Sequence, residues 1–299
     1  KTANLLIKSL KNQKKILNQI NRKQGVKEIG KETIWSNRKP SNELKFNTRL
    51  KFNEHFNFSN KIKTILVLPH AMADNVFNNE WNIFNTSYEW FYKICKKINL
   101  MDNVNWLIKP HPFEYKFNTV KAVDVFNHVI KKKSNVHFLK EGIHINDLYK
   151  YVDVVLTCNG SAGYEYPSMG VNTITTADAD YSNFDFTIAP KTQKKYFEIL
   201  KKISTIKKIK NKKIMKARVY WISILSLLWN NHNFCPKIKQ HGFFKKDLFF
   251  EKISNMNYLT NNNNFTRDII FQIENKNRHS INYNFIKKFK KFNFKLNDA

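Results

Sequence analysis

The chain has 299 residues, of which 42% are hydrophobic and 14% aromatic, so it can bury a core and is not a disordered protein. Its three cysteines, Cys95, Cys158 and Cys235, are odd in number and widely separated. This argues against a disulfide framework or a zinc cluster and fits a reducing compartment. No apolar run reaches the roughly 20 residues of a membrane span, and the first residues show no signal peptide.

The net charge of +29 is unevenly distributed. Residues 1–60 carry 14 Lys and Arg against 4 Asp and Glu, and residues 201–299 carry 22 against 5, whereas residues 61–200 carry 16 against 14. Basic flanks of this size attract polyanions or an anionic membrane surface, although runs of charge also serve simply as solvated faces. The pattern predicts an ordinary globular domain with basic extensions.

In chain order, residues 5–23 place apolar residues at near-helical spacing, which predicts a basic amphipathic helix, and residues 24–60 have no clean periodicity and are expected to form an irregular connector. Buried strands are expected at residues 63–70, 103–112, 135–139, 153–157 and 171–176, and helices at residues 83–98, 118–133, 145–152 and 161–170. Residues 192–229 are expected to form one or two helices that leave the sheet. Residues 230–299 are rich in Asn, Lys and Phe and are expected to form a partly helical region with a frayed end.

Strands that alternate with helices, with connections too long for hairpins, predict an α/β fold with a doubly wound, mostly parallel, Rossmann-like sheet. The expected organisation is a basic helix and connector over residues 1–60, a nucleotide-binding domain over residues 61–205 and a basic helical region over residues 206–299. Ligands of such sheets bind beyond the carboxyl ends of the strands. His70, His111 and Asn159–Ser161 each follow a strand directly, so they are expected at one edge.

The segment NGSAGYE offers anion-binding chemistry after the fourth strand. Its donor-binding candidates are Asn159, Gly160, Ser161, Ala162, Gly163 and Glu165. The glycines allow a tight turn, Ser161 can cap the following helix, and the free N–H groups of that helix form an anion site. Glu165, one turn later, can accept the two hydroxyls of a ribose. The alternative is that Ser161 is only an N-cap and Glu165 only a partner of the helix dipole.

The segment KPHP holds His111 between Pro110 and Pro112 after the second strand. Both prolines stiffen the chain, so the imidazole is held in one direction and can donate a ring N–H to a phosphate oxygen or leaving group. Lys109 adds positive charge nearby. The alternative is that His111 is a structural hydrogen-bonding residue.

Two further loops follow strands at the same edge. After the first strand, His70 is a candidate substrate contact, and Asp74 can act as the general base toward an acceptor hydroxyl, or simply cap a turn. After the fifth strand, Asp178, Tyr181 and Ser182 are candidate contacts to the sugar or acceptor. Asp178 and Asp180 form an Asp-x-Asp pair that could hold a divalent metal. A phosphate site at a helix N-terminus makes a metal unnecessary, so neither a metal nor a cofactor is expected.

At these residues the sequence resembles the capsule and surface polysaccharide biosynthesis proteins, glycosyltransferases of the GT-B type that include Kdo transferases and sialyltransferases. Poly(glycerol phosphate) transferases are similar in the same two loops. The resemblance covers roughly residues 63–200, through ILVLPHAMADN, SYEWF, NVNWLIKPHP, GSAGYEYPSMGVNTI and YSNFDFTIAPKTQKKYFEIL.

The resemblance implies the nucleotide-binding half of a GT-B enzyme that uses a nucleotide-sugar, CMP-linked in the sialyl and Kdo branch. By position, His111 and Pro112 match the His-Pro pair that holds the donor phosphate, Ser161 matches the Ser/Thr motif, and Glu165 lies where the family has its ribose-binding Glu. Inverting transfer would use a carboxylate base and no metal. Asp74 as that base is a hypothesis and not a carry-over from the family.

GT-B enzymes also have an N-terminal domain that binds the acceptor, and residues 1–60 are too short to form it. That domain is therefore expected to be reduced, to lie upstream of this sequence, or to come from a partner chain. The acceptor is expected to be a lipid-linked or growing glycan, and the location cytoplasmic, at the inner membrane face. Two alternatives stay open: a catalytically silent assembly protein, and nucleic-acid binding through the basic, aromatic segment at residues 284–297.

Overall fold

The computed structural model describes residues 46–72, 82–111, 114, 119–139, 148–176 and 179–223. The chain divides into two units, one of Lys39–Arg218 and one of Lys1–Arg38 with Val219–Ala299. The first unit contains the sheet, and the contacts described below lie within it. The helix expected at residues 5–23 and the region at residues 230–299 lie outside the described residues.

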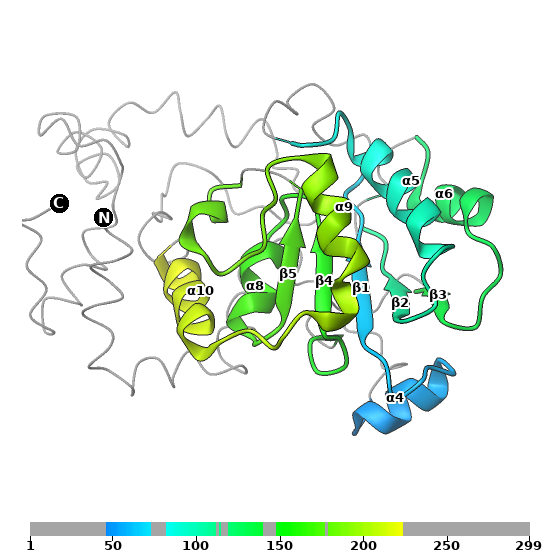
Figure 1. Cartoon of the computed structure of the whole chain (residues 1–299), viewed down its shortest axis with the longest axis horizontal. Coiled ribbons are helices and arrows are strands. Elements are labelled where there is room, and N and C mark those ends of the chain that lie inside the picture. Colours follow the sequence, from blue (N-terminus) through cyan, green and yellow to red (C-terminus); the bar gives the residue numbers. More distant parts are fainter. Residues whose placement is uncertain are drawn as a thin grey trace, which may run out of the picture. The chain divides into compact units, whose positions relative to one another are not determined.

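The predicted α/β fold is confirmed, because five strands form one sheet in which every pairing is parallel. The strands are β1 (Thr64–Leu68), β2 (Asn105–Ile108), β3 (Val136–Phe138), β4 (Val154–Thr157) and β5 (Asn172–Thr175). Their order across the sheet is β3-β2-β1-β4-β5 (Figure 1). This is the Rossmann-like arrangement, in which successive strands are added first on one side of β1 and then on the other.

The helices of this unit connect successive strands or flank them (Figure 1). They are α4 (Arg49–His55), α5 (Ser87–Ile98), α6 (Ala122–Val129), α8 (Ala162–Ser168), α9 (Gln193–Lys201) and α10 (Asn211–Ser223), the last of which continues into the second unit. Short 3-10 turns, η3 (Ser182–Phe184) and η4 (Ile203–Thr205), lie on either side of α9. Residues 192–229, predicted as one or two helices, thus contain two within the described part, separated at residues 202–210.

One face of the sheet forms the main core. Because side chains alternate along a strand, Ile65, Val67, Trp106 and Ile108 point to the same face, and each is fully buried. Apolar residues of α5, α6 and α9 pack on that face in one cluster. The indole of the buried Trp90 donates a hydrogen bond to the Tyr196 hydroxyl at 3.0 Å, which joins α5 to α9.

Helix α4 lies in the region predicted to be an irregular connector, so that prediction is wrong for residues 49–55. Thr48 caps the helix, since its hydroxyl accepts a hydrogen bond from the Lys51 N–H at 3.2 Å. Phe52 is fully buried and stacks on Tyr151 with ring centroids 4.7 Å apart. A helix of two turns shows too few apolar repeats for periodicity to identify it.

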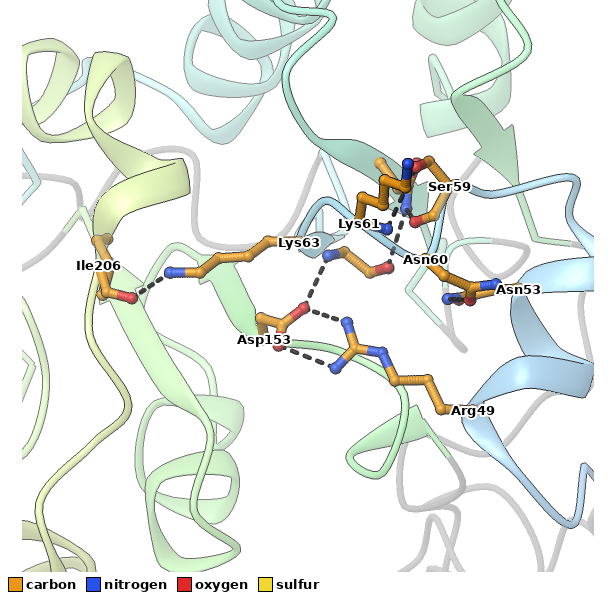
Figure 2. Close-up of polar contacts among 10 residues, drawn as sticks. Arg49, Asn53, Ser59, Asn60, Lys61, Lys63, Asp153 and Ile206 are labelled. Carbon is orange, nitrogen blue, oxygen red and sulfur yellow. Dashed lines mark hydrogen bonds and ion pairs between the residues drawn. The ribbon is translucent and has the colours of Figure 1, made fainter.

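A polar network at the amino ends of β1 and β4 ties α4 to the sheet (Figure 2). Asp153, just before β4, accepts a hydrogen bond from the Thr64 N–H at 2.8 Å and pairs with both terminal nitrogens of Arg49. Lys63, just before β1, donates to the Ile206 carbonyl oxygen. One carboxylate therefore fixes where two neighbouring strands begin.

We predict that Asp153→Ala destabilises the protein by about 1–3 kcal/mol, because it leaves a backbone N–H and a guanidinium without their shared acceptor. Urea denaturation of the full chain measures the change. Asp102→Ala is the matched control, since Asp102 forms only a surface ion pair with Lys133, and it should cost less than about 0.5 kcal/mol. Equal effects of the two substitutions would contradict the proposed role of Asp153.

Candidate functional site at the carboxyl edge of the sheet

The register of the three central strands brings their following loops to one edge. Val67 of β1 pairs with Ile108 of β2, and Leu68 pairs with Thr157 of β4. His70 therefore lies two residues beyond its strand, His111 three, and Asn159 two. Neighbouring strands are about 4.8 Å apart, so loops from β2 and β4 begin on the two sides of the β1 loop, about 10 Å apart.

Two imidazoles meet at this edge. The rings of His70 and His111 stack nearly parallel, with centroids 5.3 Å apart and an angle of 14° between their planes. Both side chains are half-buried, as is Lys109, whose backbone N–H bonds the Val67 carbonyl at 3.0 Å and extends the β1–β2 pairing. His70 was predicted only as a possible substrate contact, and the structure makes it the immediate neighbour of His111.

A buried carboxylate fixes the His111 loop, and sequence reasoning missed it. Glu114 is 5% exposed, its N–H bonds the His111 carbonyl at 3.1 Å, and its side chain accepts from the Ala122 N–H, the first residue of α6, at 2.5 Å. It joins the loop to a helix that starts eight residues later. No local motif spans that distance, so the role was visible only in the fold.

The turn after β4 has no room for a side chain at one of its glycines. Neither Gly160 nor Gly163 has a positive φ, so neither is required for backbone freedom, contrary to the sequence interpretation. At Gly163, a Cβ atom would lie 2.2 Å from ring atoms of Tyr181. Tyr181 is 3% exposed and its hydroxyl donates to the Gly160 carbonyl at 2.9 Å. The loop after β5 thus clamps the turn after β4, and Tyr181 is placed as a positioning residue.

Ser161 and Glu165 form a pair. Ser161 was expected to cap α8, but its backbone is helical, with φ −56° and ψ −24°, and its side chain makes no capping bond, so that expectation is wrong. Its side chain instead interacts with the Glu165 carboxylate in the first turn of α8. Burial raises the pKa of Glu165, and the interaction with Ser161 opposes that rise. The exposed Ser161 and Asn159 border the half-buried Gly160 and Glu165.

Cys158 precedes this turn but is not a nucleophile. It is 1% exposed, and burial raises the pKa of its thiol to about 12. The thiol therefore stays protonated at neutral pH, whereas reactive cysteines are accessible thiolates. The Cys158 carbonyl accepts a hydrogen bond from the Thr176 N–H at 3.2 Å, which continues the β4–β5 pairing beyond both strands.

Several of the predicted site residues lie outside the described residues, and others are buried or half-buried. The proposed base Asp74, together with Pro112 and Asp178, lies outside the described residues. Ala162 is buried as the first residue of α8, and Ser182 is half-buried, with its N–H bonded to the Ala179 carbonyl at 2.7 Å. Residues 284–297, the basis of the nucleic-acid alternative, also lie outside the described part.

Within residues 46–223, apart from the gaps given above, no group of three or more His, Cys, Asp or Glu side chains is placed to hold a metal ion. None of the helices that the structure describes is both long enough and apolar enough to cross a membrane.

No protein-family model matches the sequence, and no curated protein matches it. Solved structures with distant similarity include the beta Kdo 2,4 transferase KpsC of Thermosulfurimonas dismutans, with 14% identity and a TM-score of 0.39 over 72% of this chain and 56% of that one. UDP-GlcNAc 2-epimerase of Neisseria meningitidis bound to UDP-GlcNAc has 17% identity and a TM-score of 0.34 over 59% and 47% of the two chains. The wall teichoic acid polymerase TagF has 11% identity and a TM-score of 0.35 over 58% and 42%.

The chain spans about half the length of these solved structures. At such identities and TM-scores the likenesses assign neither a family nor an activity to this chain.

We predict that Gly163→Ala destabilises the protein by about 1–3 kcal/mol, because the new methyl group overlaps the Tyr181 ring. Gly160→Ala is the matched control, since its Cβ would approach nothing closer than the Thr157 hydroxyl at 3.6 Å. Thermal unfolding of both variants, and of Gly163→Ala combined with Tyr181→Ala, measures the effect. The double variant should lose less stability than the sum of the two single ones. Additive losses would show that the ring and the glycine do not oppose each other.

We predict that Glu165→Gln makes the protein more stable than the wild type at neutral pH. The raised pKa of Glu165 means that the folded state binds its proton more tightly than the unfolded state, whose carboxyl titrates near 4.5. The wild type therefore loses stability as the pH rises from 4.5 through the raised value, whereas the glutamine does not titrate. The gain should vanish below pH 4.5.

Unfolding free energies measured across that pH range test this prediction. Glu198→Gln is the control, because Glu198 is an exposed residue of α9 paired only with Lys195. A glutamine variant of Glu165 that is less stable than the wild type at neutral pH would contradict the assigned burial of the carboxylate.

Proposed function

We propose that this chain is a glycosyltransferase of surface or capsular polysaccharide biosynthesis and binds a nucleotide-activated sugar, CMP-linked, at the carboxyl edge of β1, β2 and β4. The observation that carries the proposal is the stacked His70–His111 pair, which stands at the same edge as the Ser161–Glu165 pair. Two imidazoles beside Lys109 suit a phosphate, and a hydroxyl with a carboxylate suits a ribose.

In this proposal His111 donates a ring N–H to the phosphate of the donor, and His70 holds the His111 ring by stacking. Lys109 contributes positive charge from the same loop. As the bond between the anomeric carbon and the phosphate oxygen breaks, its electron pair stays on the phosphate, which leaves as the nucleotide. Donors already aimed at that oxygen stabilise the developing charge without reorganisation.

The acceptor half of the reaction requires a base. A carboxylate takes the proton of an acceptor hydroxyl, whose oxygen then forms the new bond at the anomeric carbon on the face opposite the leaving phosphate, with inversion. Asp74 remains our candidate, on the loop after β1. His70 and Ser182 are candidate neighbours of the sugar or acceptor, together with Asp178.

The interaction of Ser161 with Glu165 has a consequence for binding. A ribose that approaches Glu165 offers two hydroxyl donors, which compete with the Ser161 hydroxyl for the carboxylate. Displacement of Ser161 would free its hydroxyl to donate to the phosphate. The pair therefore provides both groups that the donor needs, at the cost of one internal interaction.

The expected setting is the cytoplasm at the inner membrane face, where a lipid-linked or growing glycan is the acceptor. The acceptor-binding half would come from residues outside the described part or from a partner chain. A silent assembly protein with the same site would bind the nucleotide and show no turnover, so binding and turnover are tested separately.

We predict that CMP raises the melting temperature of the full chain by several degrees, and that His111→Ala and Ser161→Ala lose most of that shift, because each removes a charge-assisted hydrogen bond to the phosphate. His128→Ala is the matched control: His128 is exposed in the last turn of α6, which faces the opposite edge of the sheet. A melting temperature that no nucleotide changes would remove the proposal.

Turnover assays with CMP-Kdo, CMP-sialic acid, UDP-sugars and CDP-glycerol then identify the donor, with and without a metal chelator. The proposal expects transfer from a CMP-sugar that the chelator leaves unchanged. Binding without turnover of any donor would identify the silent assembly protein instead.

A further inference from the structure

The amino edge of the sheet, opposite the candidate site, carries an unusual concentration of lysines. Residues 201–218 contain nine Lys and Arg and no Asp or Glu. The chain between α9 and α10 crosses this edge, since the Ile206 carbonyl is bonded by Lys63 before β1 and the Lys207 carbonyl by Asn172 of β5 at 2.9 Å. The exposed lysines of this crossing are Lys201, Lys202, Lys207, Lys208 and Lys210.

Other loops add lysines to the same edge. Lys131 and Lys132 are exposed in the segment that enters β3, Lys61 is exposed before β1, and Lys150 before β4. Because all the strands are parallel, these entries lie at a common edge. Residues 61–200 are almost neutral as a sequence, so this basic surface exists only because the fold collects their lysines with those of residues 201–210.

The carboxylates of the domain do not neutralise this edge. Asp153 is paired with Arg49, Asp102 with Lys133, and Asp185 with Lys213 and Lys216 of α10, and the exposed Glu54 of α4 is a further acidic residue described there. In contrast, Glu89 and Asp124 lie in the first turns of α5 and α6, near the opposite edge. Helix dipoles account for Lys201 in the last turn of α9. They do not account for the lysines of residues 207–210, which lie in no helix.

Two exposed leucines lie in segments at the same edge. Leu50 of α4 is 58% exposed and Leu100, between α5 and β2, is 75% exposed. The large exposed hydrophobic residues described at this edge are thus aliphatic, whereas the exposed aromatic Tyr88 lies in the first turn of α5, at the other edge. Stacking on nucleic-acid bases requires aromatic rings, whereas aliphatic side chains with lysines suit the interface of a bilayer.

We propose that the amino edge of the sheet is a docking surface for an anionic lipid bilayer, formed by the lysines of residues 201–210 with those that enter β1, β3 and β4. Each lysine is drawn to the negative surface potential of the membrane, and Leu50 and Leu100 reach the headgroup region. Lysine is suited to this role because its compact charge needs no bidentate partner. The candidate site, on the opposite edge, then faces away from the bilayer. The inference does not depend on the proposed function.

The test compares two variants of the full chain in vesicle flotation without nucleotide. The amino-edge variant is K207Q/K208Q/K210Q, and the control is K121Q/K194Q/K195Q, which also removes three positive charges and whose exposed lysines begin α6 and α9 at the other edge. Vesicles are phosphatidylcholine alone or with about one-third phosphatidylglycerol. Both variants keep residues 1–60 and 211–299 unchanged and lose the same number of positive charges, so a difference between them reports the edge itself. Equal melting temperatures confirm that both are folded.

We expect the amino-edge variant to bind the anionic vesicles roughly ten- to a hundredfold more weakly than the wild type at physiological salt, and the control variant to stay within about threefold. The double variant Leu50→Ser/Leu100→Ser should weaken the part of the vesicle binding that persists at high salt. Equal binding by the two lysine variants would overturn the proposal. A loss of affinity for a single-stranded oligonucleotide that exceeds the loss for vesicles would overturn it too, in favour of a nucleic-acid partner.

Discussion

The backbone pairing of β1 with β2 on one side and β4 on the other decides where every candidate residue lies. Parallel strands that begin in register also end in register, so three loops from distant parts of the sequence leave the sheet together. The amino ends are fixed by Asp153, which holds the first N–H of β1 and the Arg49 side chain of α4. Every residue of β1 and β2 is buried, so a shift by one residue would exchange the side chains that pack on the two faces of the sheet, which opposes a slip of register.

At the carboxyl edge, the loops are held in position by contacts with other elements more than by their own backbone conformations. Glu114 joins the His111 loop to the start of α6, and Tyr181 closes over Gly163 and bonds the Gly160 carbonyl. Both are buried polar side chains: Glu114 ties its own loop to α6, and Tyr181 holds the turn after β4 from the loop after β5. This gives the stacked imidazoles and the Ser161–Glu165 pair fixed supports, which positioned binding groups require.

The strands and the longer helices could be predicted from the sequence because apolar runs and helical periodicity are local signals. Helix α4 was missed because two turns carry too little periodicity. The supports of the site were missed for another reason: the Glu114–Ala122 and Tyr181–Gly160 bonds join residues that meet only in the folded chain. The reason for Gly163 was likewise misread, since a sequence shows that a glycine is present but not which ring takes the place of its Cβ atom. The sequence predicted that the loops after the strands lie close together, because parallel strands end at one edge of the sheet. It did not predict that His70 stacks on His111.

The domain therefore has two chemically different edges, one with paired histidines and a buried carboxylate and the other with lysines. Our central claim is that one bound nucleotide touches both the β2 loop and the β4 loop. A crystal structure of the CMP complex tests it most directly. We predict that the phosphate lies about 3 Å from the His111 imidazole and that the ribose hydroxyls bond Glu165 in place of Ser161. A nucleotide bound at the lysine-rich edge, or one that contacts the β4 loop without contacting His111, would contradict the account.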